Sequence, residues 1–228
     1  MWISIHEGAK DAATSAANFI ATSLRESVEQ RGLASLALSG GSTPKLMYTA
    51  LSALDLPWHR IHFFQVDERV APDTDNARNS LHIAQLLINQ VDIPGSNWHP
   101  LPVNASPLSD AAAQYSDELS NCCQGRLDVV HLGLGDDGHT ASWPPGDPVL
   151  RSNQLVDIVQ NFRGFDRLTL TPQIINDAGV IAWLVVGTDK SQMLHRWQQG
   201  DPQLPSSAVR RGDADALFTD VQTTPTGA

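Results

Sequence analysis

The chain has 228 residues, of which 41% are hydrophobic, and it carries a formal net charge of −10 at pH 7. This length and apolar content predict one domain, residues 1–228, with a full hydrophobic core. The acidic balance and the lack of any Lys/Arg run longer than two residues argue against binding to nucleic acid, but a small anionic ligand needs only a few local donors.

The cysteine content and the N-terminus bear on the compartment. Cys122 and Cys123 are the only cysteines, and adjacent cysteines rarely form a bridge. No CxxC or Cys/His ligand spacing is present, so we do not expect a structural zinc site. The N-terminus lacks a basic region followed by an apolar stretch, and no apolar run approaches the roughly 20 residues that span a bilayer. These features predict a soluble, cytoplasmic protein.

Hydrophobic periodicity predicts the elements of the first half of the chain. The pattern indicates a helix at 8–31, a strand at 33–38, a helix at 44–54, a strand at 61–66, and helices at 80–90 and 108–121. Gly32 marks the end of the first helix, and Pro44 fits the first turn of the second.

The second half continues the alternation. We expect strands at 127–134, 155–159 and 168–171, a helix starting at Thr171-Pro172, a strand at 179–186, a helix at 189–199 and a short strand at 216–219. The unbroken apolar run "GVIAWLVV" is typical of a central strand covered on both faces. The whole pattern predicts an α/β fold with a mostly parallel sheet and helices on both of its faces.

Polar, glycine-rich segments follow the predicted strands, and parallel sheets bind ligands at the carboxyl ends of their strands. In "SGGSTP", Gly40 and Gly41 free the backbone, Ser42 and Thr43 offer hydroxyls, and a helix begins. The exposed amides of a helix N-terminus suit a phosphate, although neither a Walker A nor a GxGxxG spacing is present. The alternative is a tight turn capped by Thr43.

Two further segments carry charged or titratable groups. "DER" follows the strand at 61–66, so one carboxylate, Asp67 or Glu68, is expected to face the site and Arg69 to clamp an anion; the alternative is a surface ion pair. "GDDGH" follows the strand at 127–134. An imidazole with a neighbouring carboxylate suits a general base, which favours His139, although the residue would alternatively cap a following helix.

Taken in order, these segments resemble the 6-phosphogluconolactonase family. The resemblance rests on "LSGGSTP", "DERVAPDTDNARN", "LGLGDDGHTAS", "RLTLTPQIINDA", "GTDK" and "PSSAV", and extends from about Leu36 to Asp220. It implies a three-layer α/β/α fold with a Rossmann-like sheet, shared with glucosamine-6-phosphate deaminases. It also implies hydrolysis of 6-phospho-D-glucono-1,5-lactone to 6-phosphogluconate, without metal or cofactor.

The chain also departs from the family pattern. Trp143-Pro144 stands where Leu-Phe is usual, Arg78-Asn79 where Ser-Asn is usual, and Val221-Gln222 where small alanines are common. We expect these differences to alter the walls of the pocket rather than the reacting groups. Deaminase relatives carry "AFNEP" after the histidine, whereas this chain reads "ASWPP", which favours the lactonase.

The resemblance also implies roles for individual residues. His139 takes a proton from water and returns one to the ring oxygen, Asp137 or Asp67 orients it or holds sugar hydroxyls, and Arg69 or loop amides face the oxyanion.

The phosphate would rest on Gly40, Gly41, Ser42 and Thr43. Arg167 and Lys190 would supply positive charge; the alternative for both is simple surface solvation.

Two other functions remain open at this point: a sugar-phosphate isomerase or deaminase of the same fold, and a non-catalytic sugar-phosphate sensor. We expect a monomer or weak homodimer that binds neither nucleic acid nor membrane.

Overall fold

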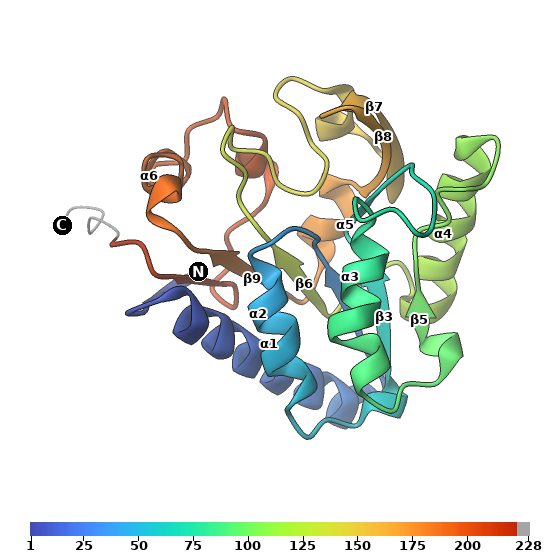
Figure 1. Cartoon of the computed structure of the whole chain (residues 1–228), viewed down its shortest axis with the longest axis horizontal. Helices are drawn as coiled ribbons and strands as arrows, with labels where there is room; N and C mark the ends of the chain where they lie inside the picture. Colours follow the sequence, from blue (N-terminus) through green and yellow to red (C-terminus); the bar gives the residue numbers. More distant parts are fainter. Residues whose placement is uncertain (223–228) are drawn as a thin grey trace.

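The computed structural model describes residues 1–222, and its main sheet has seven parallel strands in the order β1-β10-β9-β6-β2-β3-β5 (Figure 1). The strands are β1 Trp2–Ile5, β2 Ala34–Leu38, β3 Ile61–Gln65, β5 Trp98–His99, β6 Val129–Leu132, β9 Val180–Val185 and β10 Ala216–Thr219. The predicted parallel sheet is therefore confirmed. The two edge strands, β1 and β5, were not expected from the sequence; one is four residues long and the other two.

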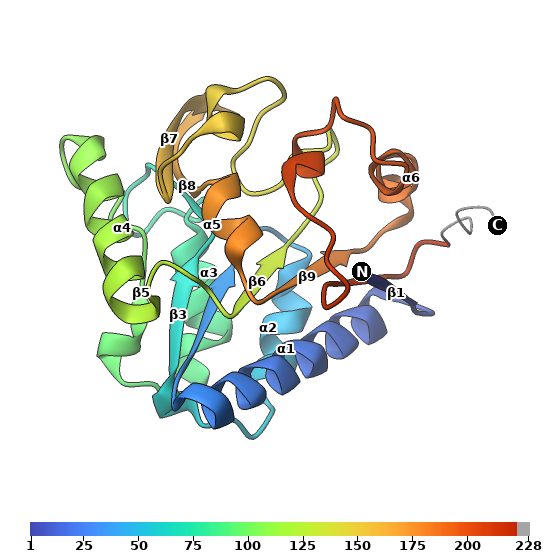
Figure 2. The ribbon, with the colours of Figure 1, turned by 180° about the vertical axis from the view of Figure 1, so that it is seen from behind.

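Helices cover both faces of this sheet and create two separate hydrophobic cores (Figures 1 and 2). The α-helices are α1 Ala9–Arg31, α2 Pro44–Ser52, α3 Asn79–Leu86, α4 Leu108–Cys123, α5 Pro172–Asp177 and α6 Ser191–Gln198. Buried residues of α1, α2 and α3 share one core, and those of α4, α5 and α6 share the other. Adjacent strand residues alternate between them: Phe63 joins the first core and Phe64 the second. The three-layer α/β/α fold is confirmed.

Short 3-10 turns complete the secondary structure of the described residues. They cover Trp58–Arg60, Ile88–Gln90, Gly95–Asn97, Pro148–Arg151, Thr188–Lys190 and Pro205–Ala208. The helix expected at 80–90 is therefore α3 followed by a separate 3-10 turn. None of the helices in this part of the chain has the length and apolar character required to cross a membrane.

The helix boundaries follow from local chemistry. Gly32 has φ 81° and donates its backbone N–H to Val28 O at 2.8 Å, which ends α1 in the left-handed conformation that glycine tolerates. Pro44 and Pro172 lie in the first turns of α2 and α5, as predicted. Thr171 does not cap α5 through its side chain; its hydroxyl instead donates to Gln154 O at 2.5 Å.

The structure contains a second, antiparallel sheet, which the sequence did not predict. It contains β4 Asp67–Arg69, β7 Val156–Phe162 and β8 Phe165–Leu170 in the order β4-β8-β7. The strands expected at 155–159 and 168–171 thus form a hairpin outside the parallel sheet, and "DER" is a strand rather than a loop. The physical reason is the connection: only Arg163 and Gly164 join β7 to β8, both with positive φ, whereas parallel strands need a long crossover.

The small sheet lies beside the carboxyl edge of the main sheet (Figures 1 and 2). Its register pairs Arg69 with Arg167 and Asp67 with Thr169. This pairing brings residues about a hundred positions apart in sequence to one place, next to the loops that follow β2 and β6.

Candidate active site

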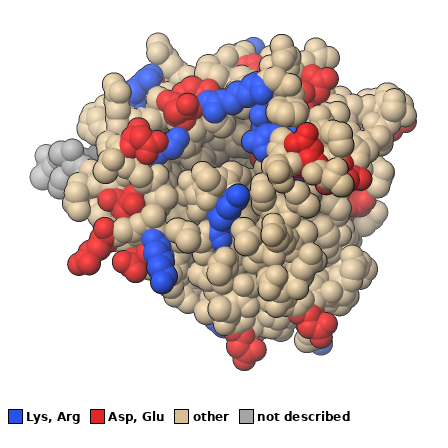
Figure 3. Space-filling model, viewed as in Figure 1, with Lys and Arg blue, Asp and Glu red and all other residues tan. Residues whose placement is uncertain are grey.

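A cavity of about 480 Å³ opens at the carboxyl edge of the main sheet. Nearly all the residues predicted for the site line it: Asp67, Arg69, His139, Gly40, Gly41, Ser42, Thr43, Arg167 and Lys190. Asp137 is the exception, because it lies behind His139. Blue side chains border the hollow in Figure 3, and the cations that line the cavity are Arg69, Arg163, Arg167 and Lys190. Asp67, Asp136 and Asp189 also line the cavity, so the lining of this acidic chain carries a small excess of positive charge.

His139 is held by Asp137 in the turn that follows β6. Its Nδ1 lies 2.5 Å from Asp137 Oδ1, and the same oxygen accepts the backbone N–H of His139 at 3.1 Å. Burial raises the pKa of Asp137, but the hydrogen bonds from His139 outweigh it and hold that pKa at about 2. The carboxylate is therefore ionised, so the tautomer of the neutral imidazole that it favours has the proton on Nδ1 and the lone pair on Nε2. The side chain is 19% exposed, and its ring packs edge-on against Phe162 at 5.2 Å.

The glycines of this turn make room for the imidazole. A Cβ on Gly135 would lie 2.0 Å from His139 Nδ1. Gly138 has φ 81°, and a Cβ there would lie 2.7 Å from Leu204. The first helical residues after this turn are the 3-10 turn Pro148–Arg151, and the first α-helix after it is α5. The alternative reading of His139 as a helix cap is therefore wrong.

Arg163 also lines the cavity, although no sequence pattern pointed to it. It occupies the β7–β8 turn with φ 53°, forms an ion pair with Asp136, and lies 3.3 Å from Asp137 Oδ2. The hydrogen bond from Arg163 lowers the pKa of Asp136. Its partners lie 26 and 27 positions earlier in the chain, so no local pattern connects them. Through Arg163, the β7–β8 hairpin thereby holds Asp137, the carboxylate that contacts His139.

Asp67 has partners other than His139. It is 5% exposed, accepts a hydrogen bond from the Ser142 hydroxyl at 2.6 Å, and lies 3.6 Å from Arg167 Nη1. Of the two candidates for orienting the imidazole, the contacts therefore select Asp137. Arg167 is only 4% exposed, which excludes surface solvation, and it packs 5.0 Å from the centre of the Phe162 ring. Burial lowers the pKa of Arg167, and the charge of Asp67 opposes this shift.

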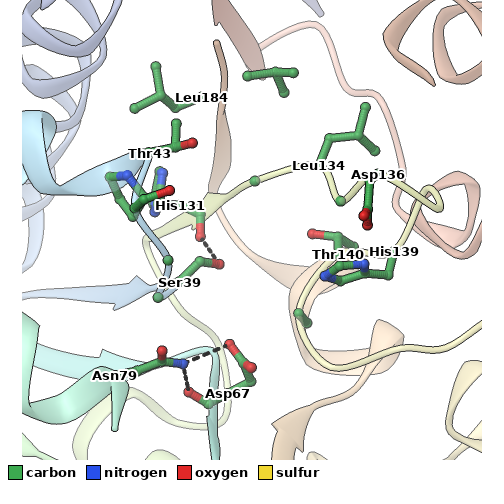
Figure 4. Close-up of a pocket in the computed structure, with 18 of the residues that line it drawn as sticks. Ser39, Thr43, Asp67, Asn79, His131, Leu134, Asp136, His139, Thr140 and Leu184 are labelled. Carbon is green, nitrogen blue, oxygen red and sulfur yellow. Dashed lines mark hydrogen bonds between the residues drawn. The ribbon is translucent and has the colours of Figure 1, made fainter. Parts of the chain in front are cut away.

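Arg69 is positioned by Asn79, another residue that the sequence analysis did not select for the site. Its Nη1 donates to Asn79 Oδ1 at 2.9 Å and to Ala77 O at 2.5 Å, so it does not form the surface ion pair considered above. Asn79 donates to Asp67 O at 2.9 Å and packs against Gly40, where a Cβ would lie 1.9 Å from it (Figure 4). A glycine is thus required at this point of the loop.

The Gly40–Thr43 loop leads directly into α2. Gly41 has φ 110°, and Thr43 makes no side-chain cap, so the alternative of a Thr-capped turn is wrong. Within residues 1–222, the Ser42 and Thr43 hydroxyls donate no hydrogen bond to another residue. Lys190, at the end of a 3-10 turn, lines the same cavity. The loop therefore retains donors for a ligand.

His131 also lines the cavity, from within β6 (Figure 4). Its side chain is 1% exposed, and among the described residues neither ring nitrogen has a hydrogen-bond partner. Burial lowers the pKa of His131 to about 3, so the ring is neutral. His131 lies inside the strand predicted at 127–134, and no sequence pattern assigned it a role at the site.

The departures from the family pattern lie outside the pocket wall. Trp143 is fully buried and donates its indole N–H to Leu170 O at 2.8 Å. Arg78 is buried and lies 3.2 Å from Glu68 Oε2. Neither residue lines the cavity, and neither does Val221, which is also buried. The expectation that these substitutions reshape the walls is wrong; they belong to the supporting packing.

Asp136, Asp137 and His139 bring possible metal-ligand atoms within 4.8 Å of one another. Arg163 already lies against both carboxylates. The positive charge that a cation would supply is thus provided by the guanidinium.

Comparison with known proteins agrees with this geometry. Residues 7–218 match the family described as glucosamine-6-phosphate isomerases/6-phosphogluconolactonase. A 6-phosphogluconolactonase of Synechocystis is 38% identical over 193 residues, covering 81% of this chain and 80% of the relative. One from Rhizobium meliloti is 32% identical, covering 93% and 95%.

Solved structures share the fold. A 6-phosphogluconolactonase from Thermotoga maritima superposes with a TM-score of 0.86 at 27% identity, covering 96% of this chain and 98% of that one. A monomeric glucosamine-6-phosphate deaminase reaches 0.84 at 20% identity, covering 96% and 97%. The second likeness concerns the fold alone, so the fold does not separate the two activities.

Proposed function

The chain belongs to the family of glucosamine-6-phosphate isomerases and 6-phosphogluconolactonases, and we infer that within it the chain is a lactone hydrolase. It hydrolyses 6-phospho-D-glucono-1,5-lactone to 6-phosphogluconate, the second step of the oxidative pentose phosphate pathway. The relatives that are 38% and 32% identical carry the lactonase name. The segment "ASWPP" after His139 also lacks the Asn and Glu of the deaminase motif.

The observation that carries this proposal is the His139–Asp137 pair at the cavity. With Nδ1–H donated to Asp137, Nε2 takes a proton from a water molecule as its oxygen attacks the lactone carbonyl. The tetrahedral intermediate then collapses: the bond from the carbonyl carbon to the ring oxygen breaks, and His139 returns the proton to that oxygen. A positioned general base and acid of this kind contributes roughly 10²–10⁴ in rate.

We assign the oxyanion to Arg69 together with backbone amides of the glycine-rich loops. Arg69 lines the cavity, and its hydrogen bonds to Asn79 and Ala77 hold it in place before substrate binds. Donors fixed in advance stabilise developing charge without reorganising during the reaction. In this assignment Asp67 is a positioning residue for Arg167 and Ser142 rather than a partner of the imidazole.

The phosphate is assigned to the Gly40–Thr43 loop and Lys190. Within residues 1–222, the hydroxyls of Ser42 and Thr43 donate to no other residue, and they lie at the N-terminus of α2. Lys190 adds a cation from the 3-10 turn Thr188–Lys190. Arg167 contributes less net charge, since Asp67 lies 3.6 Å away. We treat both sheets as one domain, because each contributes residues to the cavity. A monomer or weak homodimer stays a prediction from the sequence. We place this activity in the cytoplasm, where Cys122 and Cys123 stay reduced.

The test is a direct assay with freshly generated 6-phosphogluconolactone, corrected for spontaneous hydrolysis, beside an assay with glucosamine 6-phosphate. We expect turnover of the lactone only. His195→Ala serves as the matched control for His139→Ala, because the exposed imidazole of His195 lies on α6 outside the cavity. Turnover of the amino sugar would favour the deaminase. Binding of 6-phosphogluconate without acceleration of lactone hydrolysis would favour the sensor.

A further inference from the structure

A second cluster of titratable groups lies away from the active-site cavity, where β3, β5 and α4 meet. His62 on β3, His99 on the edge strand β5 and Cys122 near the end of α4 bring their ligand atoms within 4.8 Å of one another. Both ribbon views show β5 beside α4 (Figures 1 and 2). None of the three residues lines the active-site cavity.

The separations match those of metal ligands. His62 Nδ1 lies 3.0 Å from His99 Nε2, and Cys122 Sγ lies 3.9 Å from the same nitrogen. In a tetrahedral zinc site two imidazole nitrogens lie about 3.3 Å apart, and a nitrogen and a thiolate sulfur about 3.6 Å apart, given the usual bond lengths. The two separations from His99 Nε2 differ from these values by a few tenths of an ångström, and the ligand atoms of His62 and Cys122 lie within 4.8 Å of each other.

His99 has the supporting contacts of a metal-ligating histidine. Its other nitrogen, Nδ1, lies 3.5 Å from Glu118 Oε2, and Gln114 donates to the second oxygen of Glu118 at 3.0 Å. Its ring stacks on Phe64 with 4.5 Å between centroids. A carboxylate on the far nitrogen fixes the tautomer that leaves Nε2 unprotonated, which is the form that binds a metal.

The protonation states of the cluster agree with this geometry. Burial lowers the pKa of His62 and that of His99, and the nearby His62 lowers that of His99 further. Both rings are therefore neutral near pH 7. Burial raises the pKa of the Cys122 thiol, so a metal must displace its proton, as zinc does when it binds cysteine.

We propose that His62 Nδ1, His99 Nε2 and Cys122 Sγ bind one Zn²⁺ ion, with water in the fourth position. The ion replaces the hydrogen bond between the two imidazoles and releases one proton from Cys122. It ties the two-residue edge strand β5 and helix α4 to β3, so its role is structural. Two imidazoles and a thiolate suit zinc better than magnesium or calcium, which prefer oxygen ligands.

The three ligands come from three elements, at positions 62, 99 and 122, so no short motif joins them. This is why the spacing of the cysteines and histidines indicates no zinc site. Lactone hydrolysis uses none of these residues, so the proposal does not rest on the proposed function.

The experiment begins with reduced, chelator-treated protein, titrated with Co²⁺ as a spectroscopic probe and then with Zn²⁺. We expect one ion per chain, a sulfur-to-cobalt charge-transfer band that Zn²⁺ abolishes, and a higher unfolding temperature with zinc. Cys122→Ser is expected to lose the band. Cys123→Ser is the matched control and is expected to keep it, because that adjacent thiol instead donates to Leu119 O at 2.9 Å. Lactone turnover is expected to stay within twofold with and without the ion.

Three further variants separate this site from the active site. His62→Gln, which changes a half-buried side chain, is expected to lose cobalt binding even if Cys122→Ser folds poorly. Glu118→Gln is expected to weaken binding roughly 10- to 100-fold. His139→Ala is expected to leave the band unchanged. Absence of the band from the wild type, its survival in Cys122→Ser, or its loss in His139→Ala would each overturn the proposal.

Discussion

Two histidines of one segment lie in opposite environments of the same cavity. His131, in β6, is buried without a hydrogen-bond partner among residues 1–222 and is neutral, because burial lowers its pKa to about 3. His139, eight positions later, is partly exposed and holds an ionised carboxylate 2.5 Å from Nδ1. One strand and one turn thus deliver two imidazoles to the cavity, and only one of them has a partner that stabilises the cation formed during proton transfer.

The two residues are of one type and differ in their partners, and the role proposed for His139 depends on its partner. Asp137 favours the tautomer of His139 in which Nε2 can accept a proton. Arg163, from the β7–β8 hairpin, in turn contacts Asp137. His131 gains nothing comparable: the nearest ring is Tyr48, 6.4 Å away between centroids. A neutral, unpartnered ring can hydrogen-bond a ligand but is a poor base at neutral pH.

Removing the partnered histidine is the largest expected effect. His139→Ala is expected to lower lactone turnover roughly 10²–10⁴-fold, because no other imidazole of the cavity has a carboxylate partner. The measurement is kcat with fresh lactone, together with circular dichroism to confirm folding. A folded variant within threefold of wild type would remove His139 from the mechanism, and an equal loss in His131→Leu would erase the contrast between the two rings.

Asp137→Asn makes the environment of His139 resemble that of His131. The amide keeps the size of the side chain but removes the negative charge that stabilises the imidazolium. We expect a loss of about tenfold or more in kcat, smaller than that of His139→Ala, with KM nearly unchanged. The double variant is expected to be no worse than His139→Ala alone. An additive loss in the double variant would show that Asp137 acts on the substrate directly.

Lys190→Ala and Arg167→Ala test the other basic residues of the cavity, and only Lys190→Ala is expected to act selectively on the phosphorylated substrate. Lys190→Ala is expected to lower kcat/KM for the phosphorylated lactone by about tenfold, corresponding to one lost charge-assisted contact, and to spare unphosphorylated gluconolactone. Arg167→Ala is expected to affect both substrates and to cost roughly 3–5 kcal/mol of stability, because Asp67 is left buried without its cation. Equal losses on both substrates for Lys190→Ala would contradict the phosphate assignment.

The last expected effect is on stability in acid rather than on turnover. His131 has a folded pKa of about 3 against an ordinary value of 6.5, so the unfolded chain binds the extra proton between these pH values. Stability therefore falls on acidification through this window, by up to about 1.4 kcal/mol per pH unit from this group. His131→Leu is expected to flatten urea-unfolding free energies between pH 6 and 4 relative to wild type. Parallel curves for the two proteins would contradict the assignment.

Asp137 contributes in a lower and separate window. Its folded pKa is about 2 against an ordinary 3.8, so the stability it provides is complete above pH 3.8 and is lost as the pH falls toward 2. The two windows barely overlap, so unfolding at pH 5 reports on His131 and unfolding at pH 3 includes Asp137. In Asp137→Asn, only the lower window is expected to change.

Much of the fold follows from local sequence. Apolar periodicity identified five of the seven parallel strands and missed the short edge strands β1 and β5. Gly32, Pro44 and Pro172 marked helix boundaries, because backbone conformation at these positions depends on the residue itself. The sequence also identified His139 and the Gly40–Thr43 loop. Polar turns after parallel strands necessarily meet at one edge of the sheet.

Only the tertiary structure decided the partners. Asp67 meets Arg167 and Ser142, Asp137 meets Arg163, and His62 meets His99 and Cys122, at separations of 23 to 100 positions along the chain. The same holds for the hairpin β7–β8, which leaves the main sheet to carry Arg163 and Arg167 to the cavity. Periodicity reports which face of an element is buried, but the groups that meet across elements depend on how those faces pack. A titratable side chain acquires its charge state and its role from that packing.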